Sequence, residues 1–177
     1  MNKLRTLALW AFFAVVGVTA LAAGIGMFLE PSHVATREAV YARTPDEVWD
    51  VIIRFDRAPQ WRSDVEAVEI ESGDPIRFIE VSDQGPVPFE VTEQERPTKL
   101  VLMIADPELP FSGSWTFVLA PVDGGTRLTI TERGSIDNPL FRFMARAFMD
   151  PAATANTYLV DLGRQFGEQI TPQAPAT

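Results

Sequence analysis

The side chains that could carry out chemistry in this chain are few, and the missing types exclude several mechanisms. Cysteine is absent and histidine occurs once, at His33. Thiol catalysis, thiolate metal sites, histidine-based triads and multi-histidine metal sites are therefore excluded, and we expect no metal or cofactor. His33 ends what we interpret as a short linker, Pro31–His33, where we expect it to be too far from any internal cavity to act as a base. Carboxylates, arginines and the two tyrosines, Tyr41 and Tyr158, remain.

Glu132 is one candidate for acid–base chemistry. In the predicted strand TRLTITER, Leu128 and Ile130 face the interior, and strand alternation places Glu132 on the same side. A carboxylate at the inner end of a strand is desolvated and has a raised pKa, as a general acid or base needs. The alternative is that Glu132 lies at the rim of the core and pairs with Arg133 or another arginine.

Tyr158 is the second candidate. It falls one position from the stripe that contains Leu159 and Leu162 in a predicted helix, so we expect it close to the buried side. It could donate a hydrogen bond to a ligand carbonyl, or pack with its hydroxyl at the edge of the core.

Large apolar side chains predicted to face inward make a stronger case for a site than any polar group. Aromatic residues and methionine adapt to flexible apolar ligands, and the same side chains could equally form a filled core. The predicted ligand-binding residues are Trp61, Phe89, Met103, Trp115, Phe117, Phe141, Met144 and Phe148.

Strands and helices of one α+β domain must position these residues. Apolar or alternating runs predict seven strands, at 35–41, 65–70, 76–81, 88–94, 99–105, 114–121 and 126–133. The last six are joined by short links, which favours an antiparallel sheet. Thr44, Pro45 and Glu47 predict a capping box that starts a helix over 44–53. A two-part helical segment runs from about Asn138 to Ile170, and its last helix is the only long element that could cover the apolar face of the sheet.

The amino-terminal segment predicts a transmembrane helix. Residues 6–29 carry no charge, and a bilayer core requires about 20 helical residues. A cleaved signal peptide is the alternative, because Ala20-Leu21-Ala22 resembles a cleavage site, but the apolar run continues beyond it. Lys3 and Arg5 precede the run, so the amino terminus is expected in the cytoplasm and the domain outside, in the periplasm of a Gram-negative cell.

Charge and composition restrict the partners. The chain has 15 basic and 24 acidic residues, a net charge of −9, which argues against nucleic acid and against electrostatic binding to anionic lipid. We expect an anchor over 1–30, a ligand-binding domain over 34–171 and a flexible tail over 172–177.

The chain resembles a known superfamily over roughly 34–171. The residues that carry the resemblance are ARTPDEVWDVI, FDRAPQW, SGSWTFVLAPVDGGTRLTI and the terminal helix. They are similar to the helix-grip (SRPBCC) superfamily, which includes START domains, the birch-pollen allergen and polyketide cyclase/dehydrase-like proteins. The resemblance implies a seven-stranded antiparallel sheet wrapped around a long carboxy-terminal helix, with Trp61 near a pocket at one side of the sheet.

The resemblance also implies a hydrophobic ligand, since members carry lipids, bind a quinone or act on polyketides. We therefore expect a membrane-anchored domain that binds a lipid, isoprenoid or polyketide-like molecule. Two alternatives remain open. One is a cyclase, dehydratase or hydrolase that uses Glu132 and Tyr158 in the same cavity, and the other is a non-catalytic protein-interaction module with a filled core.

Overall fold

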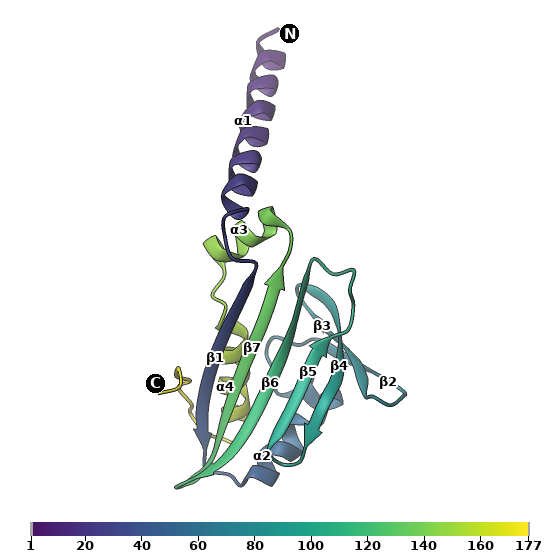
Figure 1. Cartoon of the computed structure of the whole chain (residues 1–177), viewed down its shortest axis with the longest axis vertical. Coiled ribbons are helices and arrows are strands. Elements are labelled where there is room, and N and C mark those ends of the chain that lie inside the picture. Colours follow the sequence, from purple (N-terminus) through teal and green to yellow (C-terminus); the bar gives the residue numbers. More distant parts are fainter. Residues whose placement is uncertain (1, 177) are drawn as a thin grey trace.

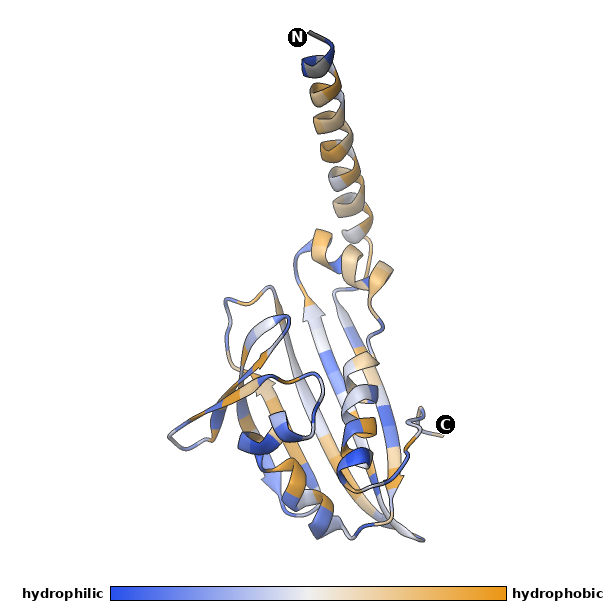
Figure 2. Ribbon diagram, turned by 180° about the vertical axis from the view of Figure 1, so that it is seen from behind, coloured by the Kyte–Doolittle hydropathy of each residue, from blue (hydrophilic) through white to orange (hydrophobic). Residues whose placement is uncertain are grey.

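The computed structural model describes residues 2–176, apart from the side chains of Asn2 and Leu4. It is an α+β structure in which a seven-stranded antiparallel sheet has the order β1-β7-β6-β5-β4-β3-β2. Figure 1 shows the strongly twisted sheet, and Figure 2 shows α2, η1 and α4 on one face of it. The strands are β1 (Ser32–Tyr41), β2 (Ala67–Glu71), β3 (Arg77–Ser82), β4 (Gly85–Glu95), β5 (Lys99–Ile104), β6 (Phe111–Val122) and β7 (Gly125–Ile136). The helices are α1 (Asn2–Gly26), α2 (Pro45–Ile52), the 3-10 helix η1 (Phe55–Gln60), α3 (Pro139–Phe148) and α4 (Ala153–Gln165). The predicted helix-grip fold is confirmed.

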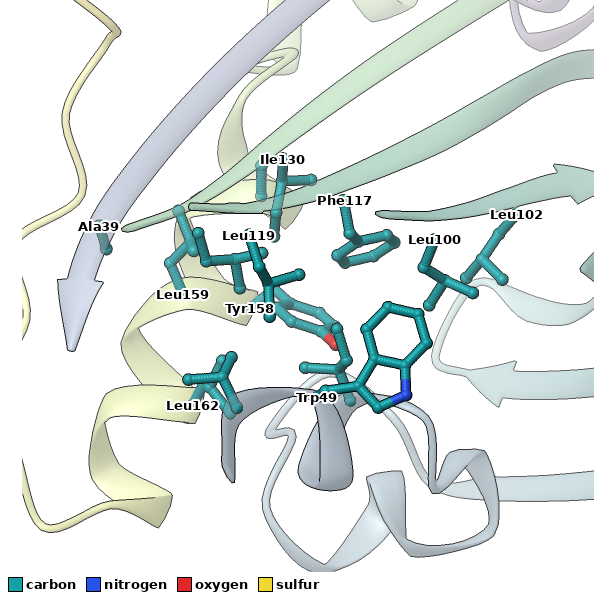
Figure 3. Close-up of a cluster of buried hydrophobic side chains, with 14 of the residues drawn as sticks. Ala39, Trp49, Leu100, Leu102, Phe117, Leu119, Ile130, Tyr158, Leu159 and Leu162 are labelled. Atoms are coloured by element: carbon teal, nitrogen blue, oxygen red, sulfur yellow. The ribbon is translucent and has the colours of Figure 1, made fainter. Parts of the chain in front are cut away.

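The core lies between the concave face of the sheet and the helices. On the central strands, Phe117 pairs with Ile130 and Leu119 with Leu128, and all four side chains are buried. Figure 3 shows Phe117 and Leu119 on the same side as Tyr158 of α4 and Trp49. The inward alternation predicted for β6 and β7 is therefore confirmed. Burying each such side chain contributes about 1.5–3 kcal/mol.

Helix α2 begins as its sequence predicts. The Thr44 hydroxyl accepts a hydrogen bond from the Glu47 amide at 3.3 Å, and the Glu47 carboxylate accepts one from the Thr44 amide at 2.7 Å. The Thr44 amide and the Thr44 hydroxyl both donate to the Glu47 carboxylate, and these two hydrogen bonds hold the pKa of Glu47 below its usual value. The capping box fixes the helix so that Val48, Trp49 and Ile52 face the core.

Strand β1 begins at Ser32, three residues before the predicted start. The reason is that β7 continues to Ile136 and offers hydrogen-bonding partners, so that Ser32 pairs with Ser135 and His33 with Gly134. The interpretation of His33 as a linker residue is therefore wrong, because His33 belongs to the sheet.

The carboxy-terminal segment divides into α3 and α4, as predicted, but α4 is shorter than expected. Gly167 has φ of +75°, a conformation that favours glycine, and the Glu168 amide donates to the Gly163 carbonyl at 2.8 Å. These features end the helix before Ile170. The segment expected to be a flexible tail is paired at Gln173, which forms a two-way backbone bridge with Glu38 at 2.8 and 3.0 Å.

Helix α1 projects from the end of the domain and is mostly orange in the hydropathy colouring (Figures 1 and 2). The helical segment Arg5–Gly26 is long and apolar enough to cross a membrane, a property that signal sequences share. Its side chains are largely exposed, with Ala22 buried where α1 approaches α3. Met1 and Thr177, the ends of the expected anchor and tail, lie outside the described residues.

Candidate functional site

A small pocket lies between the sheet, the segment from α2 to η1, and α4. Its volume is about 40 Å³, which holds a few water molecules but is far below the roughly 300–1,000 Å³ of typical ligand sites. The lining residues are Ile52, Arg54, Phe55, Ala58, Trp61, Arg62, Phe78, Glu80, Phe89, Leu100, Leu102, Trp115, Phe117 and Tyr158.

Aromatic side chains make up half of the residues that line the pocket. Phe78 stacks on Phe55 with ring centroids 4.3 Å apart and on Phe89 at 5.5 Å. Trp61 meets the ring of Tyr158 edge-on, with centroids 5.1 Å apart. These offset and edge-on contacts are the favourable geometries for aromatic pairs and give the pocket an apolar lining.

The Trp61 indole and the Tyr158 hydroxyl are polar groups of the lining without a hydrogen-bond partner among the described residues. The indole Nε1 of Trp61 is buried without an acceptor. The hydroxyl of Tyr158 makes no hydrogen bond, whereas that of Tyr41 donates to the Leu159 carbonyl at 2.9 Å. Burial raises the pKa of Tyr158 although the charge of Arg62 opposes the shift, so its hydroxyl stays protonated at neutral pH. A ligand carbonyl or hydroxyl would supply the missing acceptor.

An ion network centred on the buried Arg62, with the partly exposed Asp64 and Glu80, supports this side of the pocket. Arg62 donates through Nε and Nη2 to the Asp64 carboxylate at 3.1 and 2.7 Å, and through Nη1 to Glu80 at 2.7 Å. Burial disfavours the charged guanidinium, but Glu80 and Asp64 outweigh it and raise the pKa of Arg62. Burial also raises the pKa of Glu80, more than Arg62 lowers it. The guanidinium lies 5.1 Å from the centre of the Tyr158 ring, so this cation fixes one face of the tyrosine.

Glu132 lies on β7 opposite Trp115, but it is not part of the pocket lining. Its Oε1 is 3.5 Å from Nε2 of His33, so its partner is the histidine that we expected in a distant linker, and not an arginine. Burial raises the pKa of Glu132 although His33 opposes the shift, and Oε2 is buried without a hydrogen-bond partner. Gly134 makes the pairing possible, because a Cβ there would lie 2.3 Å from the imidazole.

The structure brings together half of the predicted ligand-binding residues. Trp61, Phe89, Trp115 and Phe117 line the pocket, together with Tyr158. Met103 lies outside it, because Leu100 and Leu102 face the interior and the alternation of β5 turns Met103 outward. Phe141, Met144 and Phe148 also lie outside it, on the exposed side of α3 at the end of the domain.

Sequence reasoning missed Phe55, Phe78 and the ion network of Arg62, Asp64 and Glu80. One signal was available for Glu80. Had Phe78 been assigned to the inner face of its strand, Glu80 would have followed two residues later on that face. Within residues 2–176, no group of three or more acidic or histidine side chains is close enough to hold a metal ion.

Comparisons with known proteins agree with this architecture. Residues 32–158 match the family described as polyketide cyclase / dehydrase and lipid transport. No curated protein sequence matches the chain.

Solved structures show the same fold at low sequence identity. Truncated norcoclaurine synthase from Thalictrum flavum is 11% identical with a TM-score of 0.62, over 76% of this chain and 93% of that chain. Protein MLL2253 from Mesorhizobium loti is 18% identical with a TM-score of 0.58, over 76% of this chain and 97% of that protein. The di-domain aromatase/cyclase StfQ of the steffimycin pathway is 14% identical with a TM-score of 0.61, over 77% of this chain. The match covers about half (52%) of the length of StfQ.

These structural likenesses establish the fold alone, whereas the family match extends from the start of β1 into α4 and covers most of the chain. The chain belongs to the polyketide cyclase / dehydrase and lipid transport family.

Proposed function

We propose that this domain binds a hydrophobic small molecule with one polar end, such as a lipid, an isoprenoid or a polyketide-like compound, in the aromatic pocket. The observation that carries the proposal is the buried Nε1 of Trp61, which has no acceptor and lies in a pocket wall rich in aromatic and aliphatic side chains. A buried donor without a partner costs about 1–3 kcal/mol, so a ligand oxygen that accepted from it would recover that free energy. Family membership supports the same class of ligand.

The pocket has to widen to admit such a ligand. Three of its aromatic side chains, Trp61, Phe89 and Trp115, are only partly buried and pack against the edge of the core. Rotation of these side chains enlarges the pocket without breaking the hydrogen bonds of the sheet. The apolar ligand surface that they then cover contributes about 25 cal/mol per Å².

The proposal includes a membrane anchor. Helix α1 and the residues around it, 1–30, would hold the domain of residues 34–171 beside the bilayer, and residues 172–177 would follow as a tail. The support is the uncharged segment that follows Lys3 and Arg5, which favours a cytoplasmic amino terminus and an extracytoplasmic domain. A site beside the bilayer has direct access to apolar molecules dissolved in it.

An enzymatic role is the second candidate, and the partly buried pair of His33 and Glu132 favours it. A carboxyl group with a raised pKa next to an imidazole is suited to proton transfer. If the domain is an enzyme, Glu132→Gln and Tyr158→Phe should each abolish turnover while ligand retention changes little.

Native mass spectrometry of the full-length protein, released gently from its own membrane, tests the binding proposal. We would compare the wild type with Ala58→Leu, which fills the pocket, and with the control Gln94→Leu, which introduces the same side chain at an exposed position of β4. A discrete added mass on the wild type and the control, lost from Ala58→Leu, is the expected result. A bare protein after ubiquinone and farnesol are offered would contradict ligand binding and favour an interaction module. An added mass on all three proteins would place the ligand elsewhere.

A further inference from the structure

We propose that α3 lies flat in the interfacial layer of the bilayer that α1 enters, with its exposed apolar side chains inserted among the lipids. The domain would then have a second attachment to the membrane besides α1. This inference rests on the proposed anchoring by α1, and it commits to lipid as the partner of this surface.

Helix α3 exposes an apolar face. The side chains of Phe141, Met144 and Phe148 recur at i, i+3 and i+7, which places them on one side of the helix, and Met149 follows at its end. All four are exposed, and Phe148 retains 74% of its accessible surface. We call these four residues the α3 apolar face. A helix with one strongly apolar, uncovered face is typical of segments that lie in a membrane interface.

The α3 apolar face continues an apolar surface at the end of α1. Met27 and Phe28 follow the last turn of α1, and Phe28 is 92% exposed. Figures 1 and 2 show α3 lying across the base of α1, so the two helices meet at one end of the domain. A lipid surface that surrounds α1 therefore reaches α3 without interruption.

The junction between α1 and α3 is fixed by close contacts. Arg142 of α3 donates to the carbonyl oxygens of Gly26 and Leu29 at 3.1 and 3.0 Å, where its charge stabilises the carboxy-terminal end of α1. The same guanidinium donates to Ile136 and Asp137 carbonyls at 3.0 Å each, which ties both helices to the end of β7. A Cβ on Gly26 would lie 1.9 Å from the Pro139 carbonyl oxygen, so the backbones of α1 and α3 nearly touch.

The length of α1 sets the depth of α3. Residues Arg5–Gly26 make 22 residues of helix, about 33 Å at 1.5 Å per residue, against a hydrocarbon core of about 30 Å. If Arg5 marks one boundary of the core, Gly26 marks the other. Because α3 contacts α1 at Gly26, it lies at the level of the headgroups, where an apolar helix face inserts about 5–10 Å.

Site-directed spin labelling of the full-length protein tests this placement. The chain has no cysteine, so each variant carries one label. The variants are Phe148→Cys on the α3 apolar face, Arg146→Cys at an exposed polar position of the same helix, Leu9→Cys within α1, and Asp123→Cys in the turn between β6 and β7. Each is reconstituted into phosphatidylcholine vesicles, and accessibility to oxygen is compared with accessibility to a water-soluble nickel chelate.

The expected result is severalfold greater accessibility to oxygen than to nickel at positions 9 and 148, with the reverse at position 123 and an intermediate value at 146. Oxygen preference at position 9 with nickel preference at 148 would overturn the placement of α3 while leaving the anchor intact, and would leave the α3 apolar face to a protein partner. Nickel preference at position 9 would overturn the anchor and this inference together.

Discussion

Replacing Arg62 by methionine should destabilise the domain strongly, and increasingly so as the pH rises. The Arg62 side chain is 8% exposed and serves two carboxylates, those of Asp64 and Glu80. Methionine keeps the apolar part of the side chain but removes the charge, so both carboxylates lose their cation. Removing one partner of a buried ion pair costs about 3–5 kcal/mol. At about 2–4 °C per kcal/mol for a domain of this size, Tm should fall by roughly 10 °C.

The pH dependence follows from Glu80. Its pKa in the native protein is already above its ordinary value of 4.5, because burial outweighs the attraction of Arg62. Below 4.5 the group is protonated in both the folded and the unfolded states, and its contribution to stability is lost as the pH rises through the native pKa. Without Arg62 the native pKa rises further, so the loss is larger. The difference in unfolding free energy between wild type and Arg62→Met should therefore be larger at pH 8 than at pH 4.

Urea unfolding of the full-length protein in detergent, followed by tryptophan fluorescence at pH 4, 6 and 8, measures this effect. Arg77→Met is the matched control, because Arg77 also pairs with a carboxylate, Glu90, but is 53% exposed and should cost at most about 1 kcal/mol. Adding Glu80→Gln to Arg62→Met should restore stability, since it removes a carboxylate without a cation. A cost that does not change with pH, or further destabilisation by Glu80→Gln, would refute the reasoning.

Two further predictions concern the partners of strand β1, namely β7 on one side and Gln173 on the other. Glu132→Gln should raise Tm more at pH 8 than at pH 4, because burial raises the native pKa of Glu132 and its contribution to stability is lost as the pH rises above 4.5. If thermal unfolding shows the same or a smaller difference in Tm between variant and wild type at pH 8, the pairing with His33 dominates instead. Gln173→Pro should lower the free energy of unfolding by about 1 kcal/mol, because proline cannot donate the backbone hydrogen bond to the Glu38 carbonyl. The control Gln173→Ala keeps that bond, so equal midpoints of urea unfolding for the two variants would contradict the prediction.

The fold could be predicted from local patterns because each element carries its own signal. Alternation in TRLTITER placed Leu128 and Ile130 inside, and the capping residues Thr44 and Glu47 located the start of α2. Boundaries that depend on tertiary partners were missed. Strand β1 begins at Ser32 only because β7 extends far enough to pair with it, and no property of residues 32–34 alone indicates that.

The candidate site could be predicted only in part, for a related physical reason. A large apolar residue in an α+β sequence is expected to be buried, but the sequence does not say whether it faces the main core or another surface. Phe117 and Phe148 look alike in sequence, yet one lines the pocket and the other is exposed on α3. The pairing of His33 with Glu132 depends on the register between β1 and β7, together with the space above Gly134, which no local pattern specifies.

The contacts around Arg62 also indicate how the pocket can widen. Moving the whole segment of residues 61–64 would break the ion pair between Arg62 and Glu80 and the hydrogen bond from the Ser63 amide to the buried Asp161 carboxylate at 2.6 Å. Breaking this ion pair costs up to about 3–5 kcal/mol, a large fraction of the roughly 5–15 kcal/mol by which domains are stable. Turning one side chain such as Trp61 away from its preferred rotamer costs about 0.5–1.5 kcal/mol. Rotation of individual rings therefore costs less free energy than moving the segment, so it is the route by which we expect the pocket to widen.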